Sequence, residues 1–119
     1  MSCVLRISAH QLEEALALVS LKPYRVERGT AHFDVSSRGF EDFAGQVDDA
    51  NAFLRTNAAD LKRLMSELGA HGVLDFAVES GRAPFQFDRF PASLVSEAGR
   101  LGLALEVSRY PSVSHADEA

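Results

Sequence analysis

Five polar side chains that could bind an anion or accept a proton lie at alternating positions of strand-like segments. They are Arg6, His32, Asp34, Asp75 and Glu106, with Arg25 and Glu27 as further candidates. An arginine can bind an anionic group, and a carboxylate can accept a proton. Because successive side chains of a strand point to opposite faces of its sheet, we expect these residues on the face turned away from the core. The first five define a candidate binding surface, which we call the polar face.

The polar face also allows a purely structural interpretation. Mixed charges on neighbouring strands form cross-strand pairs, and each such pair stabilises a sheet by roughly 0.2–1 kcal/mol. An exposed face or edge of a sheet could also support a homodimer. Both alternatives stay open beside the binding hypothesis.

The other reactive side chains predict no metal site and no nucleophile. The four histidines, His10, His32, His71 and His115, fall in different segments without the spacing of a ligand set. Cys3 is expected to be a small core residue, because the sequence places no base or helix N-terminus beside it. The chain has no GxSxG, GxGxxG or GxxxxGKS/T motif. We therefore expect no catalytic residue, no metal and no cofactor.

The composition indicates a soluble globular protein. The chain has 119 residues, of which 46% are hydrophobic, and this length is typical of one domain. Its net charge of −5 disfavours nucleic-acid binding, because phosphate backbones attract clustered basic residues. The single cysteine permits no internal disulfide, and no segment resembles a signal peptide or a membrane span. We expect a cytoplasmic protein without nucleic-acid or membrane partners.

Hydrophobic periodicity predicts alternating strands and helices. The predicted strands are 3–8, 24–29, 31–37, 71–80, 84–88 and 103–110. The predicted helices are 9–20, a bent or divided helix over 39–68, and 91–101. Ser8 and Gln11 have the spacing of a capping box for the first helix, and Pro91 suits the first turn of the last one. Adjacent acids such as Asp48 and Asp49 are expected on solvated faces, since neighbouring helical side chains diverge by about 100°.

This order of elements predicts an α+β fold. The strand–helix–strand–strand–helix–strand beginning is compatible with a ferredoxin-like arrangement, extended by a strand, a helix and a final strand. The alternating patterns favour a two-layer sandwich in which helices pack on one face of a mainly antiparallel sheet. We expect residues 1–111 to form a single domain and residues 112–119 to form a flexible C-terminal tail.

The stretch PFQFDRFP, residues 84–91, carries Phe85, Phe87 and Phe90 within eight positions. Aromatic side chains interleaved with polar ones can be a stacking platform for bases or sugars, or one edge of a core. A platform needs basic residues along a backbone track, and only two arginines are near. We therefore expect Phe85 and Phe87 on one side of a short strand, and all three rings in the core where that strand leads into a helix.

Four stretches of the chain together form a pattern of core and turn positions. They are SCVLRIS, FLRTNAADLKRL, LDFAV and FPASLVSEAGRLGLALEVSRYP. Together they resemble a family of short bacterial proteins known as a domain of unknown function, over almost the whole chain. The resemblance implies a bacterial α+β domain and transfers no active site.

These observations favour a non-enzymatic binding or interaction domain whose partner is another protein or a second copy of the chain. An immunity-type protein that neutralises a toxin would have this size, acidity and lack of catalytic motifs, since acidic surfaces match basic targets. The alternative is a small enzyme, or a regulatory module that binds a small ligand, using the polar face. The enzyme would require Arg6, Asp75 and Glu106 to converge in a concave pocket.

Overall fold

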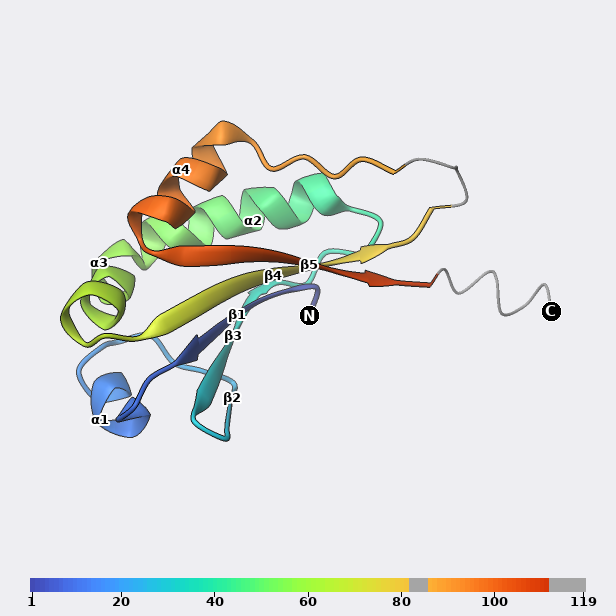
Figure 1. Cartoon of the computed structure of the whole chain (residues 1–119). Coiled ribbons are helices and arrows are strands. Elements are labelled where there is room, and N and C mark those ends of the chain that lie inside the picture. Colours follow the sequence, from blue (N-terminus) through green and yellow to red (C-terminus); the bar gives the residue numbers. More distant parts are fainter. Residues whose placement is uncertain (82–85, 112–119) are drawn as a thin grey trace.

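Five strands form one sheet in the computed structural model, which describes residues 1–81 and 86–111 (Figure 1). The strands are β1 (Cys3–Ser8), β2 (Arg25–Glu27), β3 (Thr30–Ser36), β4 (His71–Glu79) and β5 (Leu103–Tyr110). Their order is β2-β3-β1-β4-β5, and all neighbours are antiparallel except β4 and β5. The first four strands have the ferredoxin-like order, and β5 is added beside β4. The predicted tail, 112–119, lies outside the described residues.

Helices cover one side of this sheet. They are α1 (Leu12–Leu16), α2 (Phe43–Thr56), α3 (Ala58–Lys62), a π-helical turn η1 (Arg63–Glu67) and α4 (Ala92–Arg100). In Figure 1, α2, α3 and α4 lie on the same side of the strands, and α4 connects β4 to the parallel β5. Leu12 and Ala15 of α1 belong to the same core. The predicted α+β two-layer sandwich is confirmed.

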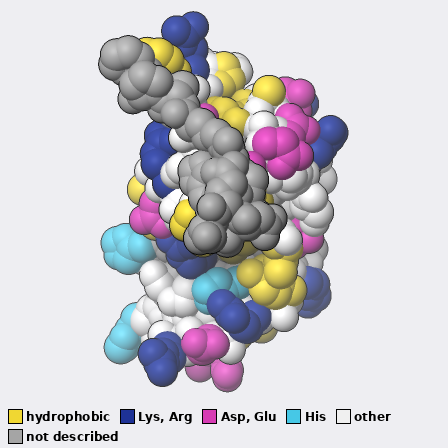
Figure 2. Space-filling view, turned by 90° about the vertical axis from the view of Figure 1, so that its right-hand side faces the viewer, with side chains coloured by type: hydrophobic (Ala, Val, Ile, Leu, Met, Phe, Trp, Pro, Cys, Tyr) yellow, Lys and Arg dark blue, Asp and Glu magenta, His cyan; other side chains and the backbone are white. Residues whose placement is uncertain are grey.

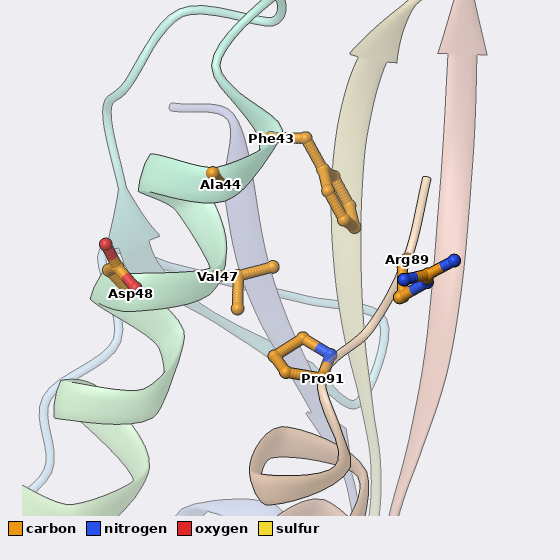
Figure 3. Close-up of a pocket in the computed structure, with 6 residues that line it drawn as sticks. All are labelled: Phe43, Ala44, Val47, Asp48, Arg89 and Pro91. Atoms are coloured by element: carbon orange, nitrogen blue, oxygen red, sulfur yellow. The ribbon is translucent and has the colours of Figure 1, made fainter. Parts of the chain in front are cut away.

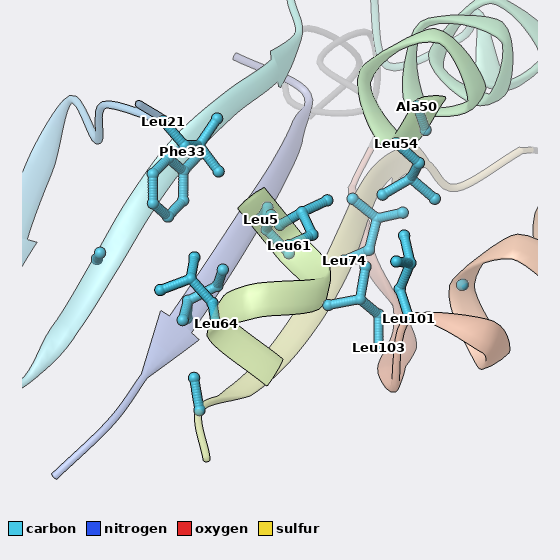
Figure 4. Packing of buried hydrophobic residues seen from close by; sticks show 14 of the residues in the cluster. Leu5, Leu21, Phe33, Ala50, Leu54, Leu61, Leu64, Leu74, Leu101 and Leu103 are labelled. Atoms are coloured by element: carbon cyan, nitrogen blue, oxygen red, sulfur yellow. The ribbon is translucent and has the colours of Figure 1, made fainter. Parts of the chain in front are cut away.

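The alternation along β1 builds the centre of the core. Cys3, Leu5 and Ile7 are fully buried, whereas the residues between them are half-buried. Leu61 and Leu64 point from the helical layer toward the strands and lie close to Leu5 (Figure 4). Full burial of one such aliphatic side chain stabilises a fold by about 1.5–3 kcal/mol, so these contacts hold the two layers together.

Two turns have the left-handed backbone that their positions require. Arg28 and Gly29, with φ of 53° and 76°, join β2 to β3. Positive φ at both central residues is the signature of a type I′ turn, whose twist matches that of a hairpin. Gly102, with φ of 77°, follows α4 and leads directly into β5. The predicted hairpin and the predicted end of the last helix are confirmed.

The first helix is shorter than predicted. It spans residues 12–16 rather than 9–20, and Ser8 does not cap it. Ser8 is the last residue of β1, where it pairs with Thr30 of β3 and His71 of β4. Because β1 has a partner strand on both sides, it extends as far as Ser8, and this residue is therefore not the N-cap of the first helix.

The predicted bent or divided helix is divided at Asn57. This residue separates α2 from α3, and its Nδ2 donates to the carbonyl oxygen of Phe53 at 2.9 Å. Asp60 of α3 then accepts from the backbone N–H groups of Ser20 and Leu21, both at 3.0 Å. The division therefore places a carboxylate where it holds the loop after α1 against the helical layer.

The predicted strand at 84–88 is wrong for its described part, residues 86–88, which form no strand. The Gln86 side chain instead bonds to the backbone at the end of β4. Its Oε1 accepts from the N–H of Gly81, and its Nε2 donates to the carbonyl oxygen of Glu79 at 3.1 Å. One amide side chain thus occupies hydrogen-bonding groups that a neighbouring strand would otherwise use.

The aromatic corner is built from a different set of rings than predicted. Phe90 packs against Phe43 and Phe76, with ring centroids 5.3 and 5.1 Å away. Phe87 is 89% exposed, so its predicted place in the core is wrong, and Phe85 lies outside the described residues. The core position of Phe90 before the last helix is confirmed.

Candidate functional site

Arg6, Asp75 and Glu106 form an ion network across three strands of the polar face. Arg6 Nη1 donates to Asp75 Oδ2 at 2.7 Å, and Arg6 Nη2 donates to Glu106 Oε2 at 2.6 Å. The strand register explains this meeting. Asp75 is directly opposite Glu106 on β5 and opposite Val4 on β1, so Arg6 is its diagonal neighbour. The structure brings together three of the five predicted residues.

Ser108 belongs to the same network, and it was not among the residues predicted from the sequence. Its Oγ lies 2.9 and 3.0 Å from the two carboxylate oxygens of Asp75 and donates to that carboxylate. Ser108 follows Glu106 by two positions on β5, so strand alternation was the signal that could have identified it. With bonds from two side chains, Asp75 is only 16% exposed.

His32 and Asp34 lie beside the network rather than within it. His32 is directly opposite Arg6 on β3, but its ring packs near Tyr24, with centroids 6.1 Å apart. Burial of the imidazole, followed by the positive charges of Arg25 and Arg6, lowers the pKa of His32 below its ordinary value. Asp34 lies two residues further along the same strand and is exposed. The polar face therefore has a centre in which one arginine pairs with two carboxylates, and an acidic, exposed position on β3.

The bonding of Arg6 limits what the network can do chemically. The hydrogen bond to Asp75 raises the pKa of Arg6, burial opposes this shift, and the bond to Glu106 adds to it. Both terminal nitrogens of the guanidinium are bonded to carboxylates within the chain. An incoming anion would therefore compete with two carboxylates that are already in place.

Cys3 is a core residue, as predicted. Its side chain is fully buried at the start of β1. Burial, reinforced by the negative charges of Asp75, Asp49 and Asp34, raises the pKa of the thiol. Because the thiolate is the reactive form, this environment keeps the residue inert.

Asp49 differs from the solvated acid that the sequence predicted. Its Oδ2 accepts from Ser36 Oγ at 2.6 Å and from Arg38 Nε at 3.3 Å. The hydrogen bond from Ser36 lowers the pKa of Asp49, burial opposes this shift, and the charge of Arg38 lowers the pKa further. Asp48, its neighbour in sequence, is exposed as predicted. Asp49 thus ties α2 to the end of β3.

A mostly apolar groove of about 280 Å³ lies between α2 and the segment that leads into α4. Figure 3 shows its lining: Phe43, Ala44, Val47, Asp48, Arg89 and Pro91. None of these residues belongs to the polar face, so the groove is a separate feature. The groove exists because the segment before α4 passes alongside α2. The hydrophobic periodicity of α2 does not predict the path of that segment.

The described residues contain no group of three or more His, Cys, Asp or Glu side chains arranged to hold a metal ion. His115 lies outside this part of the chain. Within the same ranges, no helix is long and apolar enough to cross a membrane. On the surface that Figure 2 shows, acidic, basic and histidine side chains are interspersed, in keeping with ion pairing across the molecule.

Comparisons with models of protein families, with curated proteins and with solved structures found no match. The geometry of the polar face is therefore the basis for a functional conclusion.

Proposed function

We propose that this chain is a non-enzymatic protein-binding domain and that the polar face is its binding surface. The pairing of Arg6 with both Asp75 and Glu106 is the observation that supports this function most directly. Unpaired charges must be desolvated and given new partners when another protein covers them. Charges that are already paired and held in place lower that penalty, which prepares the face for contact.

The same network disfavours a small enzyme on this face. A general base must reach a substrate proton, and an arginine that binds a substrate anion needs available N–H groups. Here Asp75 accepts from both Arg6 and Ser108, and Arg6 uses both terminal nitrogens within the chain. Catalysis would first have to break these bonds.

The side chains around the network favour a protein partner with a basic contact surface. Val4, Val73 and Ala104 lie on the same face and place small apolar groups among the paired charges, a mixture typical of interfaces. The net charge of −5 and the exposed Asp34 favour basic targets, because complementary potentials accelerate association. An immunity-type role, in which the domain neutralises a basic toxin, fits this chemistry.

Site-specific photo-crosslinking tests this function. A photoreactive residue at Asp34 should capture one discrete protein in the native cell, whereas the same residue at Glu67, exposed on the helical layer, should not. The captured protein, once purified, should bind the wild-type chain. Asp34→Lys should weaken that affinity at least about tenfold, and the matched Glu67→Lys variant should leave it unchanged.

Equal capture at both positions would contradict the assignment of the polar face. Binding that Asp34→Lys does not weaken would contradict it as well. If neither position captures a protein and a metabolite raises the thermal midpoint of the wild type but not of Asp75→Asn, the ligand-binding alternative would replace the present one.

A further inference from the structure

β5 is a long and regular edge of the sheet. It spans eight residues and pairs with β4 alone, in a continuous register, among the described residues. The opposite edge, β2, has three residues, of which two are charged. Edge strands carry unpaired backbone groups, and proteins limit unwanted pairing by shortening the strand or by adding lysine, proline or a bulge. The sequence of β5, LALEVSRY, has neither lysine nor proline.

The backbone groups of β5 that point outward can be assigned from one hydrogen bond. The N–H of Ser80 donates to the carbonyl oxygen of Tyr110 at 2.8 Å, so the backbone groups of Tyr110 face β4. The direction of these groups alternates along a strand. Leu105, Val107 and Arg109 therefore turn their N–H and C=O groups away from β4, toward the edge.

Each of the two charged side chains of β5 has an ion-pair partner within the chain. Glu106 is paired with Arg6 at 2.6 Å, and Arg109 Nη1 is paired with Asp88 Oδ2 at 2.9 Å. A charge that has a close partner repels an approaching strand less than an unpaired charge does. The charges of β5 therefore do little to prevent another strand from pairing with this edge.

The side chains of β5 also distinguish the registers in which the strand could pair with itself. Antiparallel pairing about Glu106 would set two carboxylates directly opposite each other, which is destabilising. Pairing about Val107 sets Val107 opposite Val107 and Glu106 opposite the uncharged Ser108. In this second register Leu105 is opposite Arg109, so Leu105, Val107 and Arg109 of the two copies form hydrogen-bonded pairs.

We propose that the edge of β5 binds a second copy of this chain, antiparallel and centred on Val107, so that the two sheets become one. The contact uses the edge of the sheet and leaves the polar face of each copy uncovered. It extends that face across the two-fold axis, because neighbouring β5 strands place Glu106 of one copy beside Ser108 of the other. The dimer does not depend on the protein partner that we propose for the polar face.

Light scattering of the full chain after gel filtration tests the dimer. We expect about twice the chain mass at high concentration and a shift toward the monomer on dilution. Val107→Pro removes an outward N–H without removing a bond to β4, so it should give a monomer with an unchanged far-ultraviolet spectrum. Val107→Thr keeps the N–H and the branched side chain and should remain dimeric. A wild type that is monomeric at millimolar concentration would overturn the dimer.

Cysteine cross-linking tests the register. Val107→Cys places two thiols opposite each other at the axis and should form a disulfide-linked dimer on mild oxidation. Leu105→Cys lies on the same strand and the same face but away from the axis, and it should cross-link far less. Cys3 is buried and does not compete. Equal cross-linking of both variants would overturn the Val107 register. A monomeric wild type would overturn the dimer but would not change the result expected from photo-crosslinking at Asp34.

Discussion

Arg6 on β1 donates a 2.6 Å hydrogen bond to Glu106 on β5, although β4 lies between these strands. The two residues are 100 positions apart in the sequence. The other terminal nitrogen of the same guanidinium donates to Asp75 on the intervening β4, so Arg6 binds a carboxylate on each of two strands. This connection joins the ferredoxin-like part of the sheet to the added strand.

The two carboxylates of the network should contribute unequally to stability. Asp75 is 16% exposed, whereas Glu106 is 50% exposed and more strongly screened by water. We expect Asp75→Asn to lower the free energy of unfolding by about 1–3 kcal/mol. Glu106→Gln should lower it by less than about 1 kcal/mol. Urea denaturation of both variants measures the difference, and equal losses would show that burial does not set the strength of these pairs.

Phe90 and Phe87 should respond oppositely to truncation. Phe90 is half-buried against two aromatic rings, so Phe90→Ala should destabilise the fold by about 2–4 kcal/mol. Phe87 is 89% exposed, so Phe87→Ala should change stability by less than about 1 kcal/mol. Thermal and urea unfolding of the matched pair measure both values. A larger loss at Phe87 than at Phe90 would contradict the packing of this corner.

Gln46 is a buried amide that joins α2 to the end of β4. Its Nε2 donates to the carbonyl oxygens of Ala77 at 2.8 Å and Gly39 at 3.2 Å, while its Oε1 has no partner among the described residues. Gln46→Leu leaves both carbonyl groups without this donor and should lower the free energy of unfolding by about 1–3 kcal/mol. Unchanged stability would mean that removing the buried Oε1 stabilises the fold by as much as the loss of the two Nε2 hydrogen bonds destabilises it.

Gln46→Glu gives a pH-dependent version of the same test. Burial and two facing carbonyl oxygens should raise the folded-state pKa of the new carboxyl group above its unfolded value. A raised folded pKa gives stability that is present at low pH and lost as pH rises through the folded pKa. The loss relative to wild type should therefore exceed about 2 kcal/mol at neutral pH and shrink on acidification. A loss that does not vary with pH would place position 46 in contact with water.

His32 should make the fold less stable below neutral pH. Burial, Arg25 and Arg6 lower its pKa from the ordinary value of 6.5, so the unfolded chain binds the proton more readily than the folded chain. Above the unfolded-state pKa, His32 is neutral in both states and does not change the free energy of unfolding. As pH drops through the unfolded-state pKa toward the lower folded-state pKa, the free energy of unfolding falls. Unfolding at a series of pH values should show a steeper decline for wild type than for His32→Asn.

The influence of Arg25 on this titration can be measured directly. Arg25→Gln removes a positive charge from the strand opposite His32 and should raise the pKa of the imidazole, as followed by NMR. Arg28→Gln, in the adjacent turn, is the matched control and should shift that pKa less. An unchanged imidazole pKa in Arg25→Gln would show that the charge of Arg25 is screened.

Local patterns predicted much of the fold because strand and helix periodicity is a property of neighbouring residues. The burial of Cys3, Leu5 and Ile7 follows from alternation alone, and the turn at Gly29 follows from its position between two strands. Local patterns failed at Ser8 and Gln86. Ser8 was predicted to cap the first helix, but it pairs with β3 as the last residue of β1. Gln86 was predicted to lie in a strand, but its side chain bonds to the backbone at the end of β4.

The sequence by itself determined which side chains belong to the polar face, because alternation needs only the local strand geometry. The tertiary structure alone decided which of them meet. Arg6 reaches Asp75 and Glu106 because β4 lies between β1 and β5 and its register sets Asp75 opposite Glu106. Strand order and register depend on contacts between residues far apart in the chain, and no local pattern contains them.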